Sequence, residues 1–335
     1  MAVLVVGGAG YIGSHMVAAL MESGTQAIVL DSLVEGHKQA IWPGAKFYEG
    51  NMQDTALLDK IFTENAVDSV VHFAAFVVVS ESMQNPAKYY ENNLVATLNL
   101  LQAMLRHNVK KIIFSSTASV YGMAKEMPVT EETPTGPINP YGESKLAVEK
   151  VLKWFDVAYG MKHVVFRYFN VAGAHESGKI GEDHHPESHL LPNIIKVAQG
   201  KRPAMDLFGD DYPTPDGTCV RDYVHVMDLV DAHILGLKRL DTVGESALYN
   251  LGSGGGFSNK ELIAEVKRVS GIDFPVNVKE RRPGDPPTLV ASSDKAKAEL
   301  GWNPTRTNIE NVIKTAWKWH EENPNGYSNS SFTPH

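Results

Sequence analysis

Val3-Leu4-Val5-Val6-Gly7-Gly8-Ala9-Gly10-Tyr11-Ile12-Gly13 sets the architecture of this 335-residue chain. Its apolar first part predicts a buried strand, and the residues after the glycines predict a helix over about 14–23. A second apolar strand over 27–30 ends at Asp31. Glycines at the first turn of a βαβ unit let the backbone approach a pyrophosphate, and the helix N-terminus favours the phosphate charge. This stretch therefore predicts a dinucleotide-binding unit.

Asp31 indicates which dinucleotide the unit binds. It lies roughly 20 residues beyond the glycines, where an acidic side chain binds the ribose 2′- and 3′-hydroxyls. Ser32 follows it and no arginine lies nearby, which favours an unphosphorylated ribose and hence NAD over NADP. The alternative is a glycine-rich turn that binds no ligand.

Further α/β units follow along the chain. Apolar strands are predicted over 69–73, 111–114 and 164–170. The first ends in Ala74-Ala75, which lets a cofactor approach closely, and the second ends in the hydroxyl-bearing residues 115–117. Ligands bind in the crevice outside the carboxyl ends of such strands. The pattern predicts an α/β fold with a doubly wound parallel sheet of Rossmann type.

Two features of this region can be explained by packing in the protein core alone. His72 lies inside an apolar strand, so we interpret it as a packed core residue with no catalytic role. The helix predicted over 92–106 has a wide apolar face. Packing on the sheet alone explains that face as well as packing on the sheet and on a second subunit does.

Asn139-Pro140-Tyr141-Gly142-Glu143-Ser144-Lys145 predicts the start of a helix that ends at Gly160, because Asn caps a helix and Pro suits its first position. Tyr141 and Lys145 are four residues apart and share one face. A free phenol has a pKa of about 10. A neighbouring ammonium group favours the phenolate, so the pair predicts a proton acceptor for a sugar or alcohol hydroxyl. The alternative is an ordinary tyrosine and lysine on a solvated helix.

Composition excludes several classes of protein and site. The net charge of -8, without a long basic run, argues against nucleic acid as the main partner. The single Cys219 forms no intrachain disulfide and cannot build a thiolate metal site, so we predict no metal and a cytoplasmic location. No apolar run approaches the roughly 20 residues of a membrane span, so we predict no membrane partner.

These motifs together resemble the extended short-chain dehydrogenases/reductases, and more narrowly the UDP-galactose 4-epimerase family. The likeness covers nearly the whole length. It includes, beside the motifs above, Tyr89-Tyr90-Glu91-Asn92-Asn93, Arg167-Tyr168-Phe169-Asn170, Gly209-Asp210-Asp211-Tyr212-Pro213-Thr214, Val220-Arg221-Asp222-Tyr223-Val224-His225-Val226-Met227-Asp228-Leu229, Tyr249-Asn250-Leu251-Gly252 and Arg281-Arg282-Pro283-Gly284-Asp285.

The resemblance implies a role for each matching residue. The catalytic residues would be Thr117, Tyr141 and Lys145. The residues that bind NAD would be Gly7, Gly10, Tyr11, Ile12, Gly13, Asp31, Asn51, Met52, Phe73, Ala74, Ala75, Asn92, Ser115, Tyr141, Lys145 and Tyr168. The residues that bind the UDP-sugar would be Thr117, Tyr141, Asn170, His189, Leu190, Leu207, Phe208, Arg221, Tyr223, Arg282, Asp285 and Leu289.

Some of these assignments have a physical basis or a competing interpretation. A guanidinium fork matches diphosphate oxygens at two points, which suits Arg221 and Arg282, although surface salt bridging is the alternative. The chain departs from the family pattern where Asn51-Met52 replaces Asp-Ile, and where Phe76-Val77 replaces Leu-Lys, which removes a cation near the cofactor. A third departure places His189 where it contacts the substrate or simply starts a helix.

The activity that the resemblance implies is the interconversion of UDP-glucose and UDP-galactose. The sugar C4 is inverted through a transient 4-keto intermediate, and tightly bound NAD acts as a catalyst rather than a co-substrate. Leu289, which is smaller than the tyrosine that closes the pocket in some members, implies weaker turnover of the N-acetylhexosamine pair. The expected architecture is an NAD-binding domain over 1–170, with a strand near 249–252 that returns to it, and a smaller α/β substrate domain over 171–335. A homodimer through helices near 92–106 and 141–159 is also implied.

Other functions remain open at this point. A nucleotide-sugar 4,6-dehydratase shares the first half of the chain, but that family carries Asp-Glu after the threonine, and Ala118-Ser119 cannot supply the acid and base. A 4-epimerase that acts on a UDP-pentose or a UDP-uronate is a second alternative. A non-catalytic NAD-sensing protein is a third, against which the joint presence of Thr117, Tyr141 and Lys145 argues.

Overall fold

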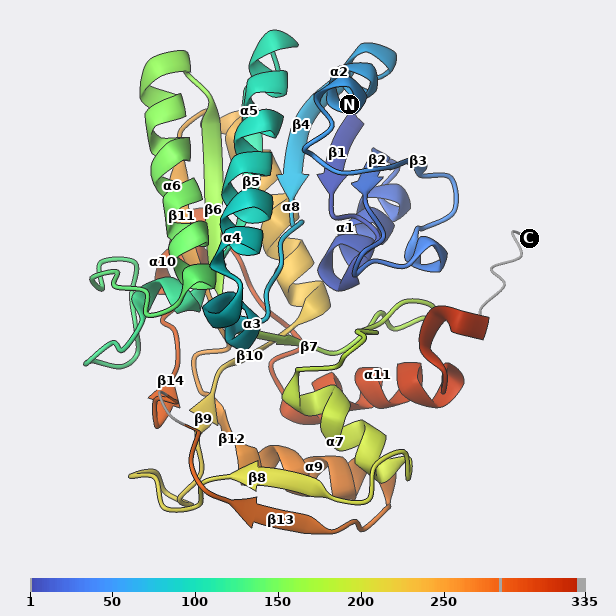
Figure 1. Cartoon of the computed structure of the whole chain (residues 1–335), viewed down its shortest axis with the longest axis vertical. Helices are drawn as coiled ribbons and strands as arrows, with labels where there is room; N and C mark the ends of the chain where they lie inside the picture. Colours follow the sequence, from blue (N-terminus) through green and yellow to red (C-terminus); the bar gives the residue numbers. More distant parts are fainter. Residues whose placement is uncertain (1, 283–284, 330–335) are drawn as a thin grey trace.

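A seven-stranded sheet forms the upper layer of the computed structural model, which describes residues 2–282 and 285–329 (Figure 1). Every pair of neighbouring strands is parallel, in the order β11-β6-β5-β4-β1-β2-β3. The predicted doubly wound α/β fold is confirmed. The strands are β1 (Ala2–Val6), β2 (Gln26–Asp31), β3 (Lys46–Glu49), β4 (Val67–His72), β5 (Lys111–Thr117), β6 (Lys162–Tyr168) and β11 (Ala247–Leu251).

Helices cover both faces of the sheet because its strands are apolar on both sides. In β1, Leu4 and Val6 join one core cluster, whereas Val3 and Val5 join the other. The first cluster includes side chains from α2 (Thr55–Glu64), α5 (Ala96–Arg106) and α6 (Pro140–Tyr159). The second includes side chains from α1 (Tyr11–Glu22), α8 (Val226–Thr242) and α10 (Asp294–Leu300).

The local signals around α6 give its boundaries correctly. The Asn139 side chain accepts a hydrogen bond of 2.8 Å from the Gly142 backbone N–H, and Pro140 occupies the first turn. The helix ends at Gly160, whose φ of 67° lies in the left-handed region that glycine adopts freely.

Two other predicted boundaries shift. Helix α1 begins at Tyr11, three residues before the predicted start, because Gly10 already occupies the N-cap position. The helix predicted from Asn92 is preceded by α3 (Val79–Gln84) and α4 (Pro86–Tyr89) and by a π-helical segment, η2 (Tyr90–Val95), that leads into α5.

A smaller lower layer follows β6. Its apolar core is built mainly from three helices, α7 (Leu190–Ala198), α9 (Asn259–Ser270) and α11 (Ile309–Glu322). Its short strands are β7 (Asn170–Ala172) paired with β10 (Tyr223–His225), β8 (Met205–Phe208) paired with β13 (Val276–Lys279), and β9 (Val220–Arg221) between β12 (Phe257–Ser258) and β14 (Thr288–Leu289). Short 3-10 turns are η1 (Lys38–Ala40), η3 (Ala118–Tyr121) and η4 (Gly326–Asn329).

The second half of the chain also contributes to the upper layer. Strand β11 pairs in parallel with β6, so that Leu251 lies beside Tyr168, and α8 packs against β5 and β6. The domain boundary predicted at residue 170 stays a prediction. Helix α8 and strand β11 follow that residue in the chain but belong to the upper layer. In the part of the chain that the structure describes, no helix has the length and apolarity to cross a bilayer.

Candidate active site

The glycine turn after β1 is packed so closely that side chains do not fit. A Cβ on Gly13 would lie 2.0 Å from the Gly7 carbonyl oxygen, and one on Gly7, where φ is 82°, would lie 2.6 Å from the Ala74 backbone nitrogen. At Gly10, the N-cap of α1, there is no side chain to bond the free N–H groups of the first turn. These N–H groups, at the positive end of the helix, suit a phosphate group.

Asp31, the last residue of β2, is held rigidly beside this turn. Its Oδ2 accepts a hydrogen bond from the Ala9 backbone N–H and its Oδ1 accepts one from Leu33, each at 2.9 Å. Burial raises the pKa of the Asp31 carboxyl, although the donated hydrogen bonds oppose that rise. The carboxylate is thus fixed at the cavity wall rather than free to swing into solvent.

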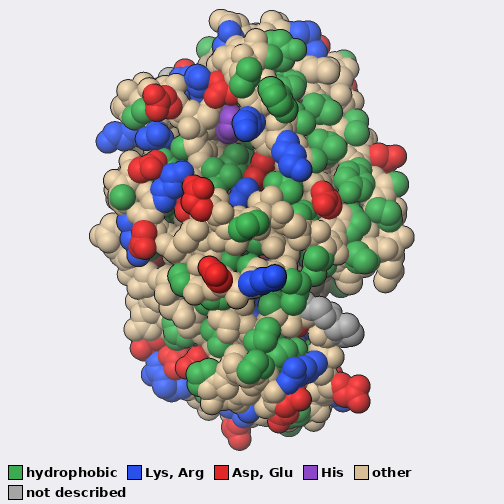
Figure 2. Space-filling view, turned by 90° about the vertical axis from the view of Figure 1, so that its left-hand side faces the viewer, with side chains coloured by type: hydrophobic (Ala, Val, Ile, Leu, Met, Phe, Trp, Pro, Cys, Tyr) green, Lys and Arg blue, Asp and Glu red, His purple; other side chains and the backbone are tan. Residues whose placement is uncertain are grey.

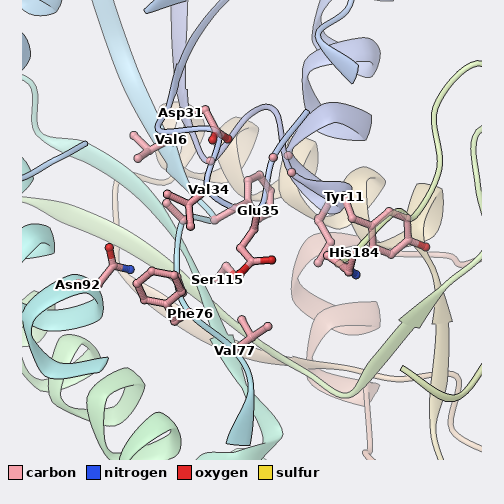
Figure 3. A pocket seen from close by; sticks show the side chains of 18 of the residues that line it. Val6, Tyr11, Asp31, Val34, Glu35, Phe76, Val77, Asn92, Ser115 and His184 are labelled. Carbon is pink, nitrogen blue, oxygen red and sulfur yellow. The ribbon is translucent and has the colours of Figure 1, made fainter. Parts of the chain in front are cut away.

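A long cavity connects the glycine turn with the carboxyl end of β5 (Figure 3). Asp31 lies at one end of the view, Asn92 and Phe76 lie on one side, and Tyr11 with His184 lies on the opposite side. All sixteen residues that the resemblance assigns to NAD line this cavity, and the cavity supports their roles, which stay predictions.

Several lining residues were missed by the sequence analysis. They come from the loop after β2, from the segment after β4, and from the segment before α7. They include Val34, Glu35, Gly36, Val78, His184, Pro186 and Ser188. No periodic pattern or spacing marks these loop residues, because their place depends on how the two layers pack.

Tyr141, Thr117 and Lys145 meet where the first turn of α6 faces the end of β5. The Thr117 side chain lies close enough to the Tyr141 hydroxyl to lower its pKa, and it accepts a hydrogen bond from the Ser119 backbone N–H at 3.1 Å. Lys145 is buried, and its Nζ donates to the Ser115 carbonyl oxygen at 2.9 Å. Burial lowers the pKa of Lys145 to about 7, against the opposing charge of Glu149.

The sequence predicted that Lys145 lowers the pKa of Tyr141, but the structure gives the opposite shift. The pKa of Tyr141 is raised, because the enclosed phenol is poorly solvated, and only the Thr117 hydrogen bond opposes the rise. Lys145, whose Nζ donates to the Ser115 carbonyl, is not among the groups that oppose this rise. The position of Tyr141 and Lys145 on one helix face was therefore not enough to predict the direction in which the pKa of Tyr141 shifts.

A buried polar network behind the site fixes β5, β6 and α6 together. Glu149 accepts from Arg167 through two hydrogen bonds of 3.0 and 2.6 Å, and from the Ser116 hydroxyl at 2.5 Å. The Ser115 hydroxyl is bonded to the Tyr168 hydroxyl. His72 is buried beside Thr97, with 2.9 Å between its Nε2 and the Thr97 hydroxyl, which fits its interpretation as a core residue.

Some of the residues assigned to the substrate gather at the junction of the two layers. Asn170 and His189 line the long cavity, and Phe208 and Arg282 line a second cavity that shares Ser188 with the first. The Arg282 guanidinium lies 4.0 Å from the centre of the Phe208 ring. This junction leaves room for a ligand that continues from the long cavity into the lower layer.

The remaining substrate assignments lie outside the walls of these two cavities, as far as residues 2–282 and 285–329 define them: Thr117, Leu190, Leu207, Arg221, Tyr223, Asp285 and Leu289. The Arg221 Nη1 is engaged by the carbonyl oxygens of Val220 and Pro286, at 3.0 and 2.8 Å. His189 is the N-cap residue of α7, so it does start a helix, and its ring faces Glu182. Pro283 and Gly284 of the quoted loop lie outside the described residues.

Comparison with known proteins shows which proteins share this sequence and fold. The family model described as GDP-mannose 4,6 dehydratase matches residues 4–316. The UDP-glucose 4-epimerase of Lacticaseibacillus casei is 53% identical, over 98% of this chain and 99% of that protein. A crystal structure of a UDP-glucose 4-epimerase has a TM-score of 0.97 at 52% identity, with 98% and 100% of the two chains covered. The UDP-glucose 4-epimerase of Bifidobacterium longum, in complex with NAD+ and UDP, has a TM-score of 0.92 at 43% identity, with 97% and 100% covered.

The matches span nearly the full length of this chain and of its relatives. The chain therefore belongs to the UDP-glucose 4-epimerase family, within the broader group of short-chain dehydrogenases/reductases that the GDP-mannose 4,6 dehydratase model describes.

Proposed function

We propose that the chain interconverts UDP-glucose and UDP-galactose by inverting the sugar C4 and uses tightly bound NAD to do so. The observation that carries this proposal is that Tyr141, with Thr117 near its hydroxyl, and Lys145 line one end of a cavity that begins at the glycine turn. The names of the relatives, and the NAD+ and UDP bound to one of them, support the same activity.

The residues of the cavity suit NAD in size and chemistry. The turn at Gly7 and Gly13 leaves no room for side chains, and the Asp31 carboxylate at the cavity wall suits ribose hydroxyls rather than a phosphate group. When bound, NAD+ supplies the acceptor for the hydride of C4 and the means of returning it to the other face.

The protein groups handle the proton and hold the nucleotide. Tyr141 takes the proton of the C4 hydroxyl, and Thr117 shares that hydrogen bond. Because burial raises the pKa of Tyr141, the phenol needs a nearby positive charge to act as a base. Lys145, one turn further along the helix, is the group that we expect to supply this charge once the bound ligands draw its ammonium away from the Ser115 carbonyl. Arg282, beside Phe208, is placed to hold the UDP part while the keto-sugar turns over.

Conversion assays separate the candidate functions. Purified protein incubated with UDP-galactose, without added NAD, is expected to form UDP-glucose. A 4,6-dehydratase would instead accumulate a 4-keto-6-deoxy product, and an NAD-sensing protein would form neither. UDP-pentoses and UDP-uronates in parallel assays test the other epimerases, and a faster conversion of either would contradict our choice of substrate.

Asp31 is expected to set the choice of cofactor. Its carboxylate is pinned by Ala9 and Leu33, so it cannot move away from a 2′-phosphate, which it would repel. Protein stripped of its cofactor should regain activity with NAD+ and little or none with NADP+. Asp31→Asn removes the charge and, because the amide NH2 cannot accept, one of the two hydrogen bonds from Ala9 and Leu33; it should narrow the preference for NAD+ over NADP+. Equal reactivation of the unchanged protein by both cofactors would refute this role.

Leu289 is proposed to set the breadth of sugar recognition. It lies in β14 and pairs with Arg221 of β9. Leu289→Tyr is expected to lower turnover of the UDP-N-acetylhexosamine pair by about tenfold or more and to spare the UDP-hexose pair, because a clash with one small group is worth about 1–3 kcal/mol. Leu289→Met, of similar volume, is the control. If both pairs fall equally, Leu289 is not the gate.

The surface supports a homodimer through α6 and the neighbouring segment η2. Large hydrophobic side chains are exposed there, namely Trp154, Val157 and Tyr159 on α6 and Tyr90 and Val95 on η2. Hydrophobic side chains gather over the upper part of the face in Figure 2. Sedimentation of the purified chain tests this proposal, and a monomer at micromolar concentration would contradict it. The buried free thiol of Cys219 suits the proposed cytoplasmic location.

A further inference from the structure

Four side chains with metal-binding chemistry converge on the segment before α7. They are Glu182, His184, Glu187 and His189, and one donor atom from each lies within 4.8 Å of all the others. None of them has a role in the proton transfer described above. They form a cluster between the long cavity and the lower layer, because His184 and His189 also line the cavity.

The spacing of the donors is close to that of a four-coordinate ion. The Nδ1 of His184 lies 3.3 Å from Glu182 Oε1 and 3.8 Å from Glu187 Oε2. The Nδ1 of His189 lies 2.5 Å from Glu182 Oε1 and 3.8 Å from Glu187 Oε1. Tetrahedral ligands at zinc bond lengths of about 2.0–2.2 Å are roughly 3.3–3.6 Å apart. If these donor atoms shifted by a few tenths of an ångström to about one ångström, their spacing would match that of tetrahedral zinc ligands.

The burial of the cluster is unusual for an ordinary surface ion pair. The side chains of Glu182 and Glu187 are only 5% and 1% exposed, and carboxylates are rarely buried so deeply without a strong partner. The buried Nδ1 of His184, which points toward both carboxylates, forms no hydrogen bond with any described group. This ring nitrogen is an available ligand atom facing two carboxylates.

At this cluster, protons compete with a metal ion for the ligand atoms of the two imidazoles. The carboxylates of Glu182 and Glu187 lie within 3.8 Å of the Nδ1 atoms of both imidazoles, so the cluster favours a positive charge at its centre. A divalent ion would replace the protons of the two imidazoles and leave the same total charge in the cluster.

We propose that Glu182, His184, Glu187 and His189 bind one divalent transition-metal ion, for which Zn²⁺ is the best match. Two imidazoles and two carboxylates are suitable zinc ligands, and zinc has no demand for a different geometry. The ion ties the segment 182–189 to the start of α7 and thereby steadies one wall of the long cavity. This revises the prediction of no metal, which rested on the single cysteine.

Titration of the holoenzyme with Zn²⁺ alone tests the site. Protein treated with a chelator and then dialysed is expected to bind one Zn²⁺ per chain in calorimetry. His184→Gln should weaken that affinity by about 10–100-fold or more, the scale seen even for groups that only support a ligand. His185→Gln is the matched control, because His185 is 70% exposed, pairs with Asp183 and is not part of the cluster. Equal weakening in both variants, or no saturable binding to the unchanged protein, would overturn the proposal.

A second measurement does not depend on the variant folding. Co²⁺ bound at this site in the unchanged protein should give the intense visible absorption of a tetrahedral ion, and one equivalent of Zn²⁺ should abolish it. Saturating Zn²⁺ should also raise the unfolding temperature of the unchanged protein and of His185→Gln, since a ligand that binds only the folded state stabilises it. Absence of the Co²⁺ bands together with an unchanged unfolding temperature would refute the site.

Discussion

Replacing Tyr141 with phenylalanine is expected to lower turnover by about 10²-fold or more while NAD stays bound, because the change removes a general base but keeps the ring. The hydroxyl is the only part of the side chain that is lost, and Thr117 lies near it. The loss should therefore appear in kcat rather than in substrate binding.

The matched control is Tyr159→Phe, which makes the same change at the exposed end of the same helix. Steady-state kinetics of the two variants with UDP-galactose, together with the cofactor content of each, give the comparison. Unchanged kcat in Tyr141→Phe, or an equal fall in both variants, would remove Tyr141 from the role of base.

Replacing Gly13 with alanine is expected to lower the NAD content of the purified protein and its activity in proportion. The added Cβ would lie 2.0 Å from the carbonyl oxygen and 2.8 Å from the carbonyl carbon of Gly7. Both obstacles are backbone atoms, so the turn itself must open, and strain of about 1–3 kcal/mol corresponds to roughly 5–150-fold weaker binding of a ligand that needs the closed turn.

Gly136→Ala is the control for this change, because a Cβ there meets nothing within 4 Å and Gly136 has an ordinary backbone conformation. The NAD released from each purified and denatured variant can be measured by its enzymatic reduction. Full NAD content in Gly13→Ala would show that the turn does not cradle the pyrophosphate.

Local signals in the sequence explain how much of this site could be predicted. The boundaries of α6 follow from Asn139, Pro140 and Gly160, each of which acts within one turn of the backbone. The glycine turn and Asp31 belong to one βαβ unit, so their mutual positions are nearly fixed by the connection itself. The carboxyl ends of β4, β5 and β6 then had to meet at one edge of the sheet.

Features that depend on packing between distant segments were not predictable in this way. The engagement of Lys145 by the Ser115 carbonyl depends on the depth of burial, which helical spacing does not reveal. The segment that carries His184 and Glu187 has no regular structure, and its approach to the cavity depends on the contact between the two layers. Leu289 was assigned through the resemblance alone, and its pairing beside Arg221 appears only in the fold.

The fate of a label at C4 tests the central claim, that C4 loses and regains the same hydrogen within the closed site. UDP-galactose that carries deuterium at C4 should be converted, in ordinary water and without added cofactor, to UDP-glucose that retains the deuterium at C4. Retention is predicted because a hydride that passes to bound NAD and back never exchanges with solvent. Loss of the deuterium to water at a rate comparable with turnover would contradict the account.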